Sequence, residues 1–133
     1  AVGLPTGERA TALALRGDRL YLGGQACPSE ALDGGDCPGR LYVYNLANPE
    51  RPALAGQLDL PGTVIDIVPA EEYLYLAAGP AGVWAVDARD PARPTIAGHQ
   101  DLSSGAQALA VVFNRVYVAS GRGGLVVLQV SQE

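Results

Sequence analysis

The chain has 133 residues, of which 48% are hydrophobic and 17% are charged, so it is neither disordered nor low in complexity. Its 17 glycines and 10 prolines suit a β protein with many turns better than a helical bundle. Nine basic residues against 14 acidic ones give a net charge of −5, which argues against a surface that binds nucleic acid. No apolar run approaches the roughly 20 residues that a membrane-spanning helix needs.

Short runs of strand-forming residues, separated by Gly, Pro, Asn or Asp, follow one another along the chain. In chain order, the sequence predicts strands around Leu13 and Tyr21, over 41–46 and 53–58, around Ile67 and Tyr75, over 83–88 and 95–99, around Leu109 and Tyr117, and over 125–130. Between them, Asn48-Pro49 and Asp90-Pro91 are typical of turn openings, because proline fixes φ and the preceding side chain accepts a hydrogen bond from its own turn. No amphipathic helix pattern interrupts this series. The sequence therefore predicts an all-β chain.

The same landmarks recur at one spacing. Residues 41–46 correspond to 83–88 and to 125–130, each 42 residues further on, and the turn at 48–52 returns as 90–94. The central tyrosines of the second strands, Tyr21, Tyr75 and Tyr117, are separated by 54 and then by 42 residues, so the first repeat carries twelve additional residues. Three independent landmarks at one period indicate an internal repeat.

A unit of about 42 residues with four strands has the dimensions of a β-propeller blade. The tyrosine-containing strand, Gly-rich turn, aliphatic strand and Asp-Pro-x-x-Pro turn, best developed over 74–94, resemble the LVIVD-repeat proteins. That family consists of bacterial β-propellers, commonly on surface or secreted proteins. The resemblance implies a propeller fold and assigns no catalytic residue. The twelve additional residues of the first repeat depart from the family pattern.

We therefore predict a single β-propeller unit over 1–133, with four-stranded repeats at about 9–62, 63–104 and 105–133 and a cysteine-containing insertion at 23–40. Three blades do not close a ring, because propellers have roughly 4–8 blades. Two copies can form a six-bladed ring in which Ala1–Leu4 of each chain completes the last blade of the other; alternatively, the chain is part of a longer propeller. A compact β-sandwich is a further alternative, because it needs no ring closure.

The insertion holds most of the candidate functional residues. Cys27 and Cys37 predict a local disulfide formed in an oxidising compartment. A structural metal site fits less well, because two further Cys or His ligands at suitable spacing are lacking. Asp33 and Asp36 have the oxygen ligands that Ca²⁺ prefers, although a Gly-rich turn with solvated carboxylates is favoured. Together with Arg40, these aspartates form the predicted partner-binding loop, since an insertion on one blade is where specific contacts are usually made.

Outside the insertion, Asp66 is predicted to line the central channel, because the first strands of propeller blades surround it. The matching residues are Ala12 and Ala108, so no metal site is expected there. His99, the single histidine, is predicted to be a solvent-facing residue near a strand end rather than a catalytic group. Trp84 is predicted to pack between blades, with sugar stacking as the alternative.

The favoured function is a non-catalytic β-propeller scaffold or interaction module of an exported or cell-surface bacterial protein. It would bind a protein partner or a second copy of itself, with no cofactor, metal, nucleic acid or membrane span and with any signal peptide absent from this chain. The alternative is a propeller enzyme or carbohydrate-binding protein whose site at the central channel forms only in the complete ring. The sequence leaves enzymatic activity open.

Overall fold

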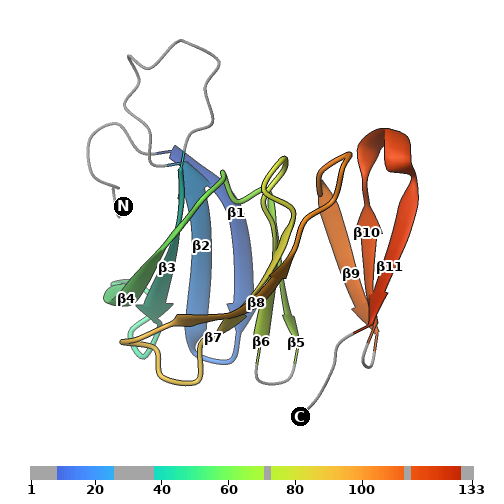
Figure 1. Ribbon diagram of the computed structural model, residues 1–133. Coiled ribbons are helices and arrows are strands. Elements are labelled where there is room, and N and C mark those ends of the chain that lie inside the picture. The colour runs from blue at the N-terminus through green and yellow to red at the C-terminus, as the bar shows by residue number, and fades with distance from the viewer. Residues whose placement is uncertain (1–8, 26–37, 71–72, 113–114, 130–133) are drawn as a thin grey trace.

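The computed structural model describes residues 9–25, 38–70, 73–112 and 115–129, which form three antiparallel sheets (Figure 1). The first sheet contains β1 (Arg9–Arg16), β2 (Arg19–Gln25), β3 (Gly39–Asn45) and β4 (Ala53–Leu60). The second contains β5 (Asp66–Ala70), β6 (Tyr73–Ala77), β7 (Val83–Asp87) and β8 (Thr95–Gln100). The third contains β9 (Ala108–Val112), β10 (Arg115–Ala119) and β11 (Leu125–Gln129), with a 3-10 turn, η1 (Gly121–Gly123), between β10 and β11.

Each strand pairs with the next strand of the chain, so every sheet is a simple meander. This arrangement confirms the all-β prediction and the predicted order of strands, and it is that of β-propeller blades in a ring that is not closed. In the part of the chain that the structure describes, β11 is an outer strand of its sheet, whereas its counterparts β3 and β7 lie between two neighbours. The third sheet is therefore described as three strands rather than the four of a complete blade.

The sheets repeat one another in register as well as in order. Tyr21 lies opposite Val43, Tyr75 opposite Ala85, and Tyr117 opposite Val127. The two four-stranded sheets also share a β-bulge, which falls between Val43 and Tyr44 in the first and between Ala85 and Val86 in the second. In each case the extra residue belongs to the fourth strand, Ala55 in β4 and Ala97 in β8, so the bulge bends the fourth strand in the same place in both sheets.

The predicted turn openers form the same turn twice. The Asn48 side chain accepts a hydrogen bond from the N–H of Glu50 at 3.2 Å, and the Asp90 side chain accepts one from the N–H of Ala92 at 3.1 Å. In each turn the backbone carbonyl of the same residue also accepts the N–H three positions later, at 3.0 Å. These bonds set the entry into β4 and β8 in the same way.

The hydrophobic core lies between the sheets. Tyr21, Leu41 and Val43 of the first sheet pack against Leu74, Leu76 and Val86 of the second, and we call this contact the first junction. Tyr75, Ala77 and Val83 of the second sheet pack against Val116 and Val118 of the third, and this contact is the second junction. Neighbouring first strands also lie beside each other, β1 with β5 and β5 with β9. Among the described residues, no helix has the length and apolarity needed to cross a membrane.

Candidate functional site

Of the three residues predicted to form the partner-binding loop, the structure describes Arg40. Cys27, Asp33, Asp36 and Cys37 lie outside the described residues, so the disulfide and the loop remain predictions. Arg40 lies on β3, where its Nε donates to Oδ1 of Asp59 on β4 at 2.6 Å. The two residues are opposite each other in register, so this is a cross-strand ion pair within the first sheet.

Asp66 lies at the start of β5 and is half-buried. Its Oδ1 accepts the N–H of Ile67 at 3.0 Å, and its Oδ2 accepts the N–H of Leu109 on β9 at 2.8 Å. The carboxylate therefore joins the second sheet to the third, which sequence reasoning did not anticipate. Its predicted place on a central channel remains a prediction.

Thr11 makes the corresponding link at the first junction. Its hydroxyl donates to the carbonyl of Val64, 2.5 Å away and just before β5, while the carbonyl of Gly23 lies at 3.3 Å. Each junction thus has a polar contact made by a side chain of a first strand, but the side chains differ. Thr11 was missed because its repeat partners, Ile65 and Gln107, share no chemistry with it.

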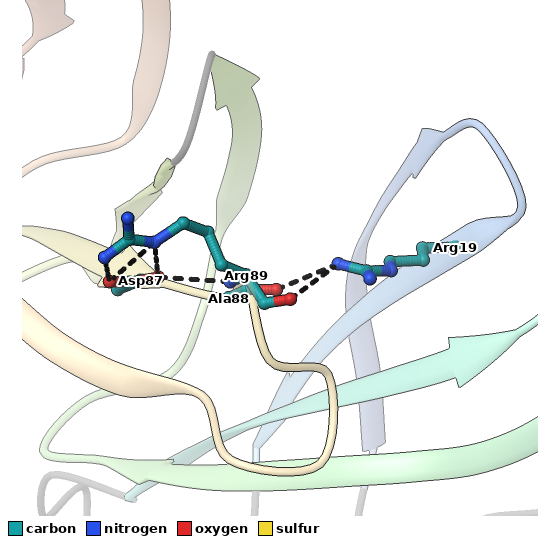
Figure 2. Close-up of polar contacts among 4 residues, drawn as sticks. All are labelled: Arg19, Asp87, Ala88 and Arg89. Atoms are coloured by element: carbon teal, nitrogen blue, oxygen red, sulfur yellow. Dashed lines mark hydrogen bonds and ion pairs between the residues drawn. The ribbon is translucent and has the colours of Figure 1, made fainter.

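A second polar link at the first junction involves Arg19 on β2 (Figure 2). Its Nη1 donates to the carbonyl of Ala88 at 3.0 Å and lies 3.4 Å from that of Arg89, both just after β7. Arg89 turns the other way and forms an ion pair with Asp87, with Nη2 and Oδ2 2.7 Å apart. The side-chain hydrogen bond from Arg89, with help from its backbone N–H, lowers the pKa of Asp87. Arg19 also lines a cleft of about 380 Å³ between these two sheets.

Trp84 and His99 form a stacked pair on neighbouring strands of the second sheet. Their ring centroids are 4.5 Å apart and the planes differ by 14°. The indole N–H donates to the carbonyl of Ala81 at 2.9 Å, and the ring packs against the core of the first junction. His99 is exposed. Because His99 covers one face of the indole and the core lies nearby, this geometry favours packing over a sugar-stacking platform.

The described residues cover the outer part of the first junction but leave a groove at the second. At the first junction the turn over 90–94 lies directly on β4, so close that a methyl group placed on Gly56 would overlap the carbonyl oxygen of Pro91. At the second junction the equivalent glycine, Gly98, has no atom of a described residue within 4 Å of that position, and the positions equivalent to the turn begin at residue 132, outside the described ranges. A groove of about 490 Å³ lies there, lined by Tyr73 and Tyr75 among others.

The contacts of Thr11, Arg19 and Asp66 link neighbouring sheets, whereas the Arg40–Asp59 and Trp84–His99 pairs lie within one sheet. No group of three or more His, Cys, Asp or Glu side chains comes together as a metal site within the described ranges. The residues singled out in the sequence, Arg40, Asp66 and His99, lie on different strands and are not brought into one site.

The comparison with protein families agrees with the repeat. The model of the LVIVD repeat matches residues 61–101 and 104–133, just over half of the chain. These matches cover the second and third sheets, whereas the first sheet, with its insertion, lies outside them. No curated protein matches the chain.

Proposed function

Because the chain belongs to the LVIVD-repeat family, we propose that it is a non-catalytic β-propeller module that binds protein through the outer faces of its sheets. Its partner is a protein or a second copy that completes the ring. The observation that carries this proposal is the exposure of apolar side chains at both ends of the row of sheets, at repeat positions that are buried inside it.

We name the two surfaces the leading face and the trailing face. The leading face is the side of the first sheet that points away from the second and includes Leu13 and Leu15. The trailing face is the side of the third sheet that points away from the second and includes Leu125 and Val127. Large exposed apolar surfaces of this kind mark sites of protein interaction.

Equivalent positions of the repeat show how exposed a side chain is with and without a neighbouring sheet. Leu13 is 63% exposed, whereas Ile67 at the same position of the second sheet is 4% exposed. Leu125 is 70% exposed, whereas Leu41 at the same position of the first sheet is fully buried. The same side-chain positions are thus covered wherever a neighbouring sheet is present.

We also propose that the protein is exported or displayed on a bacterial surface. The support is the Cys27–Cys37 pair in the sequence and the usual location of the family. Peptide mapping without reduction, on protein purified from its own compartment, tests this part. A Cys27–Cys37 cross-linked peptide is expected, and two free thiols would contradict it.

Metal analysis and a glycan array test the non-catalytic character. We expect no stoichiometric ion in the purified protein and no glycan binding. A bound ion that is lost in Asp66→Ala but kept in the matched control Asp101→Ala would contradict the proposal, since it would mark a channel metal site. Specific glycan binding would instead establish the carbohydrate-binding alternative.

A further inference from the structure

Building on the proposed interaction role, we infer that the trailing face of one copy binds the leading face of a second copy, so that chains associate head to tail. The two junctions inside the chain are examples of the same kind of contact. Of the two partners that the proposed function names, a protein or a second copy, the matched faces favour the second copy.

The first junction shows which residues a sheet packs against the sheet that follows it in the chain. Tyr21 from β2 and Leu41 and Val43 from β3 are all buried against the second sheet. At the same repeat positions, the trailing face presents Tyr117, Leu125 and Val127. The chemistry is matched residue by residue: a tyrosine flanked by two aliphatic side chains from the next strand.

The same junction shows which residues a sheet packs against the sheet that precedes it in the chain. Leu74 and Leu76 from β6 and Val86 from β7 are buried there, and Pro94 is buried after the turn. At these repeat positions, the leading face presents Leu20, Leu22, Tyr44 and Pro52. These four residues line an apolar pocket of about 140 Å³. By analogy with Tyr21, the ring of Tyr117 from a second copy is the group that fills it.

A polar contact supports the same pairing. Arg19, which donates to the carbonyls of Ala88 and Arg89 at the first junction (Figure 2), corresponds to Arg115 in the third sheet. Arg115 is exposed on β10. The carbonyls equivalent to those of Ala88 and Arg89 on the leading face belong to Leu46 and Ala47, at the end of β3. The trailing face therefore has the donor, and the leading face has the acceptors, that the internal junction uses.

Because the two faces differ, the contact is heterologous, and it either closes into a ring or continues as an open chain. Two copies bring six sheets together, which lies within the roughly 4–8 blades of closed propellers. We therefore expect a two-chain ring, with a solution mass twice 13.7 kDa.

Complementation between two variants tests the inference. The leading-face variant carries Leu13→Glu and Leu15→Glu, and the trailing-face variant carries Leu125→Glu and Val127→Glu. All four side chains are at least half exposed, so the sheets should keep their fold, which circular dichroism checks. Ile96→Glu, at an exposed position of the second sheet, is the matched control. Light scattering behind a sizing column measures the mass of each protein and of an equimolar mixture.

The wild-type chain and Ile96→Glu are expected to be dimers. Each face variant alone is expected to be a monomer, with association weakened by about 100-fold or more, because a buried charge would stand without a partner. The mixture is expected to form a 1:1 dimer, since one unmodified leading face and one unmodified trailing face remain. A trailing-face variant that dimerises alone would overturn the inference, because it would show pairing between like faces.

Arg115→Ala gives a second readout that does not depend on the apolar changes. It should weaken association about tenfold, the loss expected for a hydrogen bond to a charged donor. A folded monomeric wild type would overturn head-to-tail pairing while leaving the non-catalytic binding module intact. Conversely, a stoichiometric metal lost in Asp66→Ala would contradict the proposed function even if the dimer forms, so the two failures are distinguishable.

Discussion

The two junctions follow one repeat pattern, but their buried aliphatic side chains differ in size. The first contains the larger buried side chains, Leu74, Leu76 and Leu41, and the turn over 90–94 covers its outer part. Each junction buries one tyrosine, Tyr21 or Tyr75, but the aliphatic side chains of the second are smaller, Ala77, Val116 and Val118 among them, and a groove lies beside Gly98. A junction thus has two separable layers, an apolar core between the sheets and a turn that covers it. At the second junction the structure describes the first layer, and the positions equivalent to the covering turn begin at residue 132, outside the described residues.

The largest expected difference lies in the cores. Leu76→Ala at the first junction should lower the free energy of unfolding by about 3 kcal/mol, because it removes three buried carbon atoms and leaves a cavity. Val118→Ala, at the same repeat position of the second junction, should cost about 2 kcal/mol, since it removes two. Urea denaturation measures both. Equal losses would show that packing at the two junctions is equivalent despite the difference in side-chain size.

The covering turn gives the next effect and the sharpest contrast. Gly56→Ala should cost about 2 kcal/mol, because the new methyl group overlaps the carbonyl of Pro91 and displaces the turn. Gly98→Ala should be neutral or stabilising by up to about 1 kcal/mol, since no atom of the described residues lies within 4 Å and the unfolded chain loses freedom. The same denaturation experiment compares the pair. A comparable loss in Gly98→Ala would mean that the groove is filled in solution.

The polar link at the second junction should contribute less. Asp66→Ala removes the acceptor for the N–H of Leu109 and should cost about 1.5 kcal/mol. Asp66→Asn keeps one carbonyl oxygen in place and should recover part of that loss. Hydrogen exchange at the Leu109 amide provides a local measurement. Unchanged protection of this amide in Asp66→Ala would show that the bond does not persist in solution.

The smallest effect is the pH dependence from Asp87. Its pKa is lowered in the folded state by Arg89, so the pair stabilises the fold above the carboxyl's ordinary pKa of 3.8. This contribution is lost as the pH falls through the lowered value. Denaturation of the wild type and Asp87→Asn between neutral and acidic pH should therefore show a slightly smaller loss of stability for the variant in acid. Parallel curves would show that the pair is not formed in solution.

Much of the fold could be predicted from the sequence because the repeat carries it. Strand positions, the paired turns at Asn48 and Asp90 and the blade-like order of sheets follow from spacing and turn chemistry alone. The shared β-bulge could not, because an extra residue opposite a partner strand leaves no mark in a single strand's composition.

The links between sheets were the hardest part to predict. Asp66 was singled out, but its partner is a backbone N–H, and such a partner has no residue type to recognise. The contact of Arg19 was missed for the same reason, because its partners are two backbone carbonyls. Its counterpart in the second sheet is Tyr73, which has no guanidinium group with which to bind them. The insertion with Cys27 and Cys37 remains a prediction, because those residues lie outside the described ranges.

The turn over 90–94 belongs to the second repeat in sequence but lies on the first sheet through Gly56. The order of synthesis therefore matters. A ribosome adds about 5–20 residues per second, so several seconds separate the emergence of Gly56 from that of Pro94. During that interval the first sheet is complete in its strands but uncovered on its apolar side. This side is buried only after the second repeat has been made and has packed against it.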